Sequence, residues 1–163
     1  MPRFVEVQHQ EWIAAPRAAV QAQFADLQHH IHANVHPKLS FEILSQGPDS
    51  ARYVQVVRLL GIAQRDVFER RIHPDGRLVD TSVEGFNAGG SIEARFRDEA
   101  RAGRAGTAVD LTVRLPLPPV IGPLLRPLLE SQIRKELSAA AAEDKRDIEE
   151  RGYVMPELRR QAA

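Results

Sequence analysis

Hydrophobic and polar residues alternate along much of the chain, and this pattern predicts a series of strands. In segment 3–13, Val5, Val7 and Ile13 share one face, and His9 and Glu11 lie in the same register. A period of two is typical of a half-buried strand. Similar segments, separated by turn residues, follow at 39–46, 51–60, 62–73, 77–86, 91–99 and 107–115. Their connections are too short for crossover helices, so we expect about seven strands in one antiparallel sheet.

Two short helices are predicted directly after the first strand. Pro16 suits the first turn of a helix, because its missing N–H costs nothing there, and this predicts a helix over 16–25. Asp26 is a candidate N-cap for a second helix over 27–35, which Pro37 would end.

The pattern becomes helical after residue 119. Apolar residues then recur at helical spacing at Ile121, Leu125, Leu128, Leu129, Ile133, Leu137, Ala140, Ala141 and Ile148. Pro123 and Pro127 are expected to delay or kink the start of this helix, and nothing interrupts it from about 128 to 150. Gly152 is a candidate C′ residue. We therefore expect a single domain over 1–152 and a flexible C-terminal tail over 153–163.

Composition narrows the class of protein. The chain has 163 residues, with 22 Lys+Arg and 22 Asp+Glu, so its formal net charge is zero. This balance argues against a nucleic-acid partner. The absence of cysteine excludes disulfides and thiolate catalysis. No apolar run is long enough to span a bilayer, so we expect no stable membrane insertion and a cytoplasmic protein. The excess of Arg over Lys, 19 to 3, suggests a GC-rich bacterial genome.

Two segments resemble those of a known superfamily. Trp12-Ile13-Ala14-Ala15-Pro16-Arg17-Ala18-Ala19-Val20 is similar to its opening strand and helix, and Leu117-Pro118-Pro119-Val120-Ile121-Gly122-Pro123-Leu124-Leu125-Arg126 to the start of its long helix. With the order of elements, they resemble the helix-grip fold of the START-like (SRPBCC) superfamily over residues 3 to about 150. The resemblance implies an α+β domain whose sheet wraps around the C-terminal helix.

The same resemblance implies a cavity between the sheet and the long helix. Related proteins include polyketide cyclase/dehydrase-like proteins, lipid-transfer domains, plant hormone receptors and the catalytic domain of Rieske oxygenases. What they share is a cavity for an apolar or aromatic ligand. The fold alone does not say how this chain uses such a cavity.

Several side chains are candidates for the cavity wall. His9 and Glu11 share the apolar face of the first strand and are candidate catalytic acid–base residues, although a strand end can also lie in water. Arg58 and Arg114 are candidates for orienting a ligand. Strand 62–73 carries Gln64, Asp66 and Arg70 on the face of Phe68, and Arg65, Glu69 and Arg71 on the face of Val67, so its inward face stays open. The candidate apolar ligand contacts are Tyr53, Phe86, Phe96, Leu129 and Ile133.

Four of the six histidines lie within eight residues: His29, His30, His32 and His36. On a continuous helix, His29, His32 and His36 would share one face. The i, i+4 spacing of His32 and His36 is one at which two imidazoles can bind the same metal ion. The alternative is a polar helix whose histidines face water.

A carboxylate from the long helix would complete such a metal site. Asp144 is the candidate because it lies near the apolar stripe, and Glu143 and Asp147 are alternatives. Two histidines and one carboxylate suit a transition metal such as non-haem iron. Rieske oxygenases hold iron on this fold with two histidines five apart, and no pair here has that spacing. A Rieske domain would also need cysteine, so only a less specific transition-metal hypothesis remains.

These observations predict a protein that binds a small hydrophobic, aromatic or lipid-like ligand. One alternative is a cyclase/dehydratase-type enzyme that uses cavity acid–base residues, and another is a metal-dependent activity at the histidines. The apolar segment Pro118–Leu129 is a candidate homodimer contact or membrane-surface contact, and the simpler interpretation is that it covers one end of the cavity.

Overall fold

The computed structural model describes residues 3–119 and 122–162, and within this part of the chain seven strands form one antiparallel sheet. The spatial order of the strands is β1-β7-β6-β5-β4-β3-β2. Their bounds are β1 (Phe4–Ile13), β2 (Ser40–Gln46), β3 (Ser50–Leu59), β4 (Ile62–Ile72), β5 (Leu78–Gly85), β6 (Ser91–Asp98) and β7 (Thr107–Pro116). Val120 and Ile121, placed by the sequence at the start of the long helix, lie outside the described residues, as do Met1, Pro2 and Ala163.

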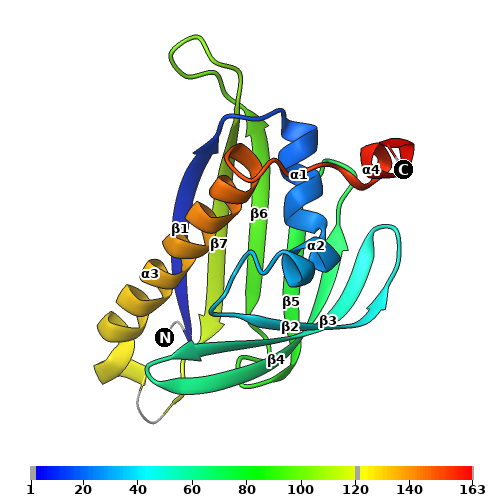
Figure 1. Ribbon diagram of the computed structural model, residues 1–163. Helices are drawn as coiled ribbons and strands as arrows, with labels where there is room; N and C mark the ends of the chain where they lie inside the picture. The colour runs from blue at the N-terminus through cyan, green and yellow to red at the C-terminus, as the bar shows by residue number, and fades with distance from the viewer. Residues whose placement is uncertain (1–2, 120–121, 163) are drawn as a thin grey trace.

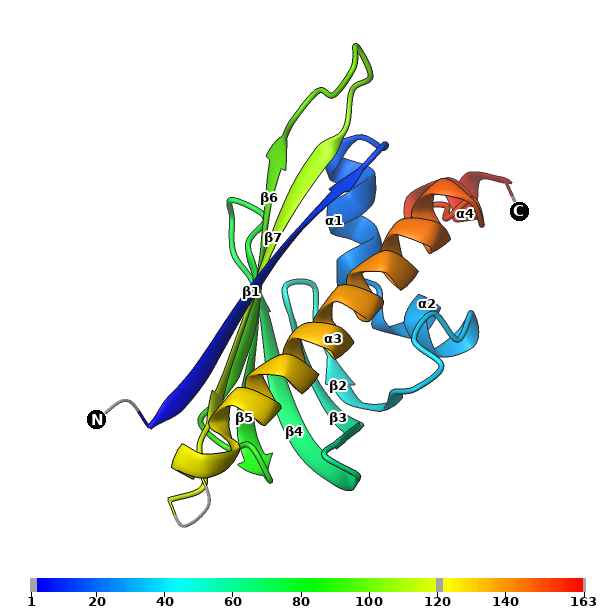
Figure 2. The ribbon, with the colours of Figure 1, turned by 90° about the vertical axis from the view of Figure 1, so that its left-hand side faces the viewer.

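The helices lie on one side of the sheet (Figures 1 and 2). They are α1 (Arg17–Ala25), α2 (Leu27–His32), α3 (Gly122–Glu149) and α4 (Pro156–Ala162). The long helix α3 runs obliquely across the sheet, and α1 and α2 lie beside its C-terminal half (Figure 2). This confirms the predicted α+β helix-grip architecture. None of the described helices is long and apolar enough to cross a membrane.

Strand β1 joins the sheet through β7, from the other end of the chain. The pairing is antiparallel and regular, with Val7 opposite Val113 and Ile13 opposite Thr107. Val5, Val7 and Ile13 are buried, as the alternation predicts. Their face packs toward α3, and these residues join residues of the sheet and of α3 in two hydrophobic clusters.

Irregular pairing marks the sheet where β4 meets β5. The register shifts between Val67 and Phe68, which bends and twists a strand pair locally. Gly85 ends β5 with φ +118°, and a Cβ there would lie 2.3 Å from the carbonyl oxygen of Arg65. Only glycine fits this close approach, and the adjacent Phe86 N–H donates to the same oxygen at 3.1 Å.

The second helix is shorter than the sequence pattern predicts. Asp26 caps α2 as expected, its side chain accepting a hydrogen bond from the N–H of His29 at 3.0 Å. The helix ends at His32, not at residue 35, and Asn34 adopts φ 49°. A left-handed residue just past a helix stops it. Residues 33–39 therefore form an irregular connection to β2, and their side chains do not follow helical spacing.

The predicted delay at the start of the long helix is wrong. Helix α3 begins at Gly122 and contains Pro127. The Gly122 N–H already donates to the Pro118 carbonyl oxygen at 2.9 Å, so the helical hydrogen bonds begin before the two prolines. Pro127, in the second turn, lacks an N–H and so removes one backbone hydrogen bond without ending the helix.

Part of the predicted C-terminal tail is helical. Residues Pro156–Ala162 form α4. The hydroxyl of Tyr153 donates to Asp26 Oδ2 at 3.0 Å, and its ring lies edge-on to His29 with centroids 4.7 Å apart. These contacts bring the segment after α3 against the start of α2.

Candidate functional site

A cavity of about 200 Å³ lies between α3 and the sheet. Its walls are largely apolar, with side chains from β3, β6 and β7 facing Ile133, Leu137 and Ala140 of α3. The polar side chains in its lining are His30, His36, Lys38, Tyr53, Gln55, Asp66, Arg70, Asp80, Asn87, Glu136, Glu143 and Asp144. Most of them belong to three groups, each built from different elements of the fold.

The first group is a buried ion pair beside Tyr53. Arg70 and Asp80 are direct cross-strand neighbours on β4 and β5, and two guanidinium nitrogens donate to the two carboxylate oxygens at 2.8 Å each. Arg70 also donates to the carbonyl oxygens of Phe24 and Ala25, at 3.1 and 3.3 Å, which are orphan acceptors at the end of α1. The ion pair thus fixes α1 against the sheet.

Charge and burial keep this group in defined protonation states. Burial lowers the pKa of Arg70, but neighbouring Asp80 more than offsets this and holds the pKa above its usual range. Burial, with Asp80 nearby, raises the pKa of Tyr53 well above its usual range. Tyr53 is therefore a neutral phenol at neutral pH, able to donate a hydrogen bond.

The second group surrounds Asp66, next to the irregular β4–β5 pairing. Its carboxylate accepts from the Ser82 hydroxyl at 3.1 Å, the Asn87 N–H at 2.6 Å and the Asn87 side-chain amide at 2.8 Å. That amide also donates to Gln64 at 2.9 Å. All four side chains are buried. The group fastens the 85–90 turn to the sheet and turns a carboxylate toward the cavity.

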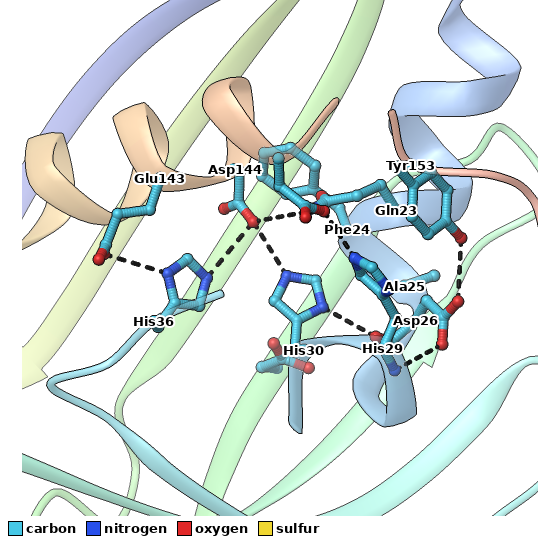
Figure 3. A network of polar contacts seen from close by, with 12 residues as sticks. Gln23, Phe24, Ala25, Asp26, His29, His30, His36, Glu143, Asp144 and Tyr153 are labelled. Atoms are coloured by element: carbon cyan, nitrogen blue, oxygen red, sulfur yellow. Dashed lines mark hydrogen bonds and ion pairs between the residues drawn. The ribbon is translucent and has the colours of Figure 1, made fainter. Parts of the chain in front are cut away.

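The third group contains two histidines around one carboxylate (Figure 3). Nε2 of His30, on α2, lies 2.9 Å from Asp144 Oδ1 of α3, and Nε2 of His36 lies 3.4 Å from the same oxygen. The outer ring nitrogens also have acceptors. His30 Nδ1 lies 2.8 Å from the Asp26 carbonyl oxygen, and His36 Nδ1 lies 3.2 Å from Glu143 Oε1.

A layer of contacts behind this group holds it in place (Figure 3). The Gln23 amide donates to Asp144 Oδ1 and to Asp147 Oδ2, at 3.0 Å each. His29 Nε2 lies 2.7 Å from Asp147 Oδ2. Helices α1, α2 and α3 are therefore joined by polar contacts at this end of the cavity.

The pKa values in the third group move in opposite directions. Burial lowers the pKa of His36, but Asp144 and Glu143 more than offset this, so its pKa is raised. Burial raises the pKa of Asp144, but His36 and His30 outweigh burial and hold its pKa well below the usual range. Asp144 is therefore ionised at neutral pH, and the structure places a fixed negative charge between two imidazoles.

The predicted ligand contacts fall into different places. Tyr53 and Ile133 line the cavity. Leu129 and Phe96 pack against the core outside the lining, and Phe86 is exposed. The two predicted arginines are both exposed on the surface. Arg58 donates to the Gly61 carbonyl oxygen at 2.9 Å, and the Arg114 guanidinium lies 3.9 Å from the Phe4 ring centroid.

His9 and Glu11, predicted to face the cavity, are not among the residues that line it. They are half-buried neighbours, with His9 Nε2 3.4 Å from Glu11 Oε2. They sit on edge strand β1, and Lys145 of α3 approaches Glu11 Oε1 at 3.7 Å. The pair therefore contacts α3 from the edge of the sheet.

The structure brings together a different histidine pair from the predicted one. His36 and Asp144 are in the group as expected, but His32 is exposed and His29 contacts Asp147 instead. His30, named in the sequence cluster but not as a ligand, takes their place. The helical spacing that selected His32 fails because α2 ends before residue 36.

Sequence reasoning left Arg70, Asp66 and Asp80 unassigned. The signal that could have found them is the face of Phe68, because residues two apart on a strand share a face. Phe68, Asp66 and Arg70 all line the cavity, whereas Val67 on the other face of the strand does not. The cross-strand register then places Asp80 opposite Arg70.

Similarity to known proteins appears in the structure and not in the sequence. No family model matches the chain, and no curated protein sequence matches it. The protein TTHA0849 from Thermus thermophilus has a similar structure with a TM-score of 0.76 and 20% identity, over 91% of this chain and 100% of that one.

Two further structures carry names that describe a family or an activity. The Zhui aromatase/cyclase from Streptomyces sp. R1128 aligns with a TM-score of 0.68 and 20% identity, over 93% of this chain and 99% of that one. A START superfamily protein from Mycobacterium smegmatis aligns with a TM-score of 0.64 and 14% identity, over 83% and 92%. At these identities the comparison establishes a shared fold.

Proposed function

We propose that this chain, which has the helix-grip fold of START-like proteins, binds a small hydrophobic or aromatic molecule in the cavity between α3 and the sheet. The observation that carries the proposal is the cavity itself, whose apolar walls come from both the sheet and the helix. Apolar burial supplies about 25 cal/mol per Å² removed from water, and a few polar groups orient a ligand.

The size of the cavity favours a compact ligand. Its volume of about 200 Å³ is below the roughly 300–1,000 Å³ of sites for drug-sized molecules. A molecule of one or two rings with a polar edge fits this description. Tyr53 can donate a hydrogen bond to that edge, since its phenol stays protonated.

Filling the cavity should abolish binding of an aromatic probe. Ala140 of α3 lines the cavity, and Ala140→Phe places a ring in it. We expect the affinity for 2-naphthol, measured by isothermal titration calorimetry, to fall at least tenfold. Ala142→Phe is the matched control, because Ala142 is exposed on the same helix. Equal binding by both folded variants, or no binding by the wild type, would contradict the proposal.

A second candidate is acid–base catalysis on the bound molecule. It is favoured by the similarity to an aromatase/cyclase and by ionisable groups in the lining, among them Tyr53, Asp66 and His36. Such groups commonly contribute about 10²–10⁴-fold to a reaction rate.

Native mass spectrometry of freshly purified protein, compared with its denatured mass, would reveal a retained ligand.

That ligand distinguishes binding from turnover. A substrate held by an active dehydratase would already have reacted, so we expect the retained ligand to be the product and its hydrated form, heavier by one water, to be converted into it by fresh protein. A hydrated form recovered unchanged after incubation with fresh protein would contradict dehydration and support binding alone.

A further inference from the structure

The polar group at the α2 end of the cavity has the arrangement of a metal centre. One ligand atom each from His30, His36 and Asp144 lie within 4.8 Å of one another, and all three side chains are buried. At bond lengths of about 2.0–2.2 Å, neighbouring ligands of a transition metal are roughly 2.8–3.1 Å apart in an octahedral site and roughly 3.3–3.6 Å apart in a tetrahedral one. The two histidine–carboxylate separations here are 2.9 and 3.4 Å.

The outer contacts select the ligand atom of each ring. The Asp26 carbonyl oxygen has no hydrogen, so His30 Nδ1 donates to it and the lone pair of the neutral ring is on Nε2. Glu143 does the same at Nδ1 of His36. Metal-binding histidines are commonly held by such a hydrogen bond from their other nitrogen. Both Nε2 atoms then face Asp144 Oδ1, and two facing electron pairs require a cation between them, either a proton or a metal ion.

The surrounding charges favour a cation. Glu143, Asp144 and Asp147 are three carboxylates on one stretch of α3. Among the described residues, the ion pairs of these three carboxylates are with histidine and none is with Lys or Arg. In the described part of the chain, no Lys or Arg therefore neutralises these three carboxylates through a direct ion pair.

We propose that His30 Nε2, His36 Nε2 and Asp144 Oδ1 bind one divalent first-row transition-metal ion at the wall of the cavity. Two imidazoles and one carboxylate suit Zn²⁺, Co²⁺ or Fe²⁺ better than Mg²⁺ or Ca²⁺, which prefer oxygen ligands. Three protein ligands leave a coordination position free. Because all three side chains line the cavity, that position opens toward it, where an oxygen atom of a bound molecule could take it.

The test is a titration of tag-free protein with Co²⁺ and with Zn²⁺. We expect one ion per chain by isothermal titration calorimetry, and visible ligand-field absorption from the Co²⁺ form. His36→Gln and Asp144→Asn should each weaken binding at least 100-fold and remove the absorption. His32→Ala is the matched control, since His32 belongs to the same cluster in sequence but is exposed, and it should bind as the wild type does.

Several results would overturn the proposal. One is stoichiometric metal binding that survives in both His36→Gln and Asp144→Asn. The others are metal binding that is lost in His32→Ala, and no metal binding by the wild type at millimolar concentrations of the metal. Circular dichroism of each metal-free variant separates lost ligands from lost structure, and two chemically different variants guard against one that fails to fold. Ala140→Phe should keep the metal while losing 2-naphthol, so this test stands apart from that of the hydrophobic ligand.

Discussion

Replacing Arg70 with alanine is expected to lower the free energy of unfolding by about 3–5 kcal/mol, because it leaves a buried carboxylate without its partner. Asp80 receives both of its short hydrogen bonds from this guanidinium and is itself buried. The substitution also leaves two carbonyl oxygens at the end of α1 without their donor. Urea denaturation followed by circular dichroism measures the change.

Two further variants separate burial from charge. Arg52 and Glu69 form an exposed ion pair at 3.5 Å on the two neighbouring strands β3 and β4. Arg52→Ala should change stability by less than about 1 kcal/mol, as exposed pairs usually do. Arg70→Met combined with Asp80→Leu should recover much of the loss, since no charge is then left unpaired. A loss below about 1 kcal/mol for Arg70→Ala would show that water reaches Asp80.

Asp144→Ala is expected to cost a similar amount, about 3–5 kcal/mol when measured in EDTA. Its Oδ1 accepts from the Gln23 amide and contacts both His30 and His36, so one substitution removes the partner of three buried groups. Because these contacts join α1, α2 and the 33–39 segment to α3, we also expect the wall of the cavity to become disordered at the α2 end. Thermal and urea denaturation, with 2-naphthol binding at low temperature, follow both effects.

Glu150→Ala is the matched control for Asp144→Ala. Glu150 is an exposed carboxylate just after the same helix, 3.8 Å from Arg146. We expect its loss to change stability by less than about 1 kcal/mol. A loss of stability below about 1 kcal/mol for Asp144→Ala as well would contradict this expectation. It would show that His30 and His36 do not depend on Asp144 for a partner.

The sequence predicts the sheet well because alternation reports which face of a strand is buried. Val5, Val7 and Ile13 are buried as expected, but the inward face of β4 stays open in the sequence because Val67 and Phe68, on opposite faces, are both apolar and both buried. Alternation does not report which part of that face a helix covers. His9 and Glu11 share the buried face of β1 yet lie outside the cavity, because α3 crosses the sheet beside them.

The histidines show a second limit of sequence patterns. Asp144 is placed beside the histidines because it lies near the apolar stripe of the long helix, and the structure brings it against His36, 108 positions away in the chain. Helical spacing fails to select His30 over His32, because the left-handed Asn34 ends α2 and turns the chain before His36. The partner of a residue beyond a helix end depends on tertiary packing, which short-range periodicity does not contain.

The pairing of β1 with β7 has a consequence for synthesis of the protein. Val7 meets Val113, so β1 has no neighbour in the sheet until more than a hundred further residues have been made. At about 5–20 residues per second this takes roughly 5–20 s on the ribosome. Bringing the two strands together closes a chain segment of that length, and the conformational entropy is lost before the contacts between the strands can offset it. Of the seven strands, β1 therefore waits longest for its partner, and the long helix that crosses it is made later still.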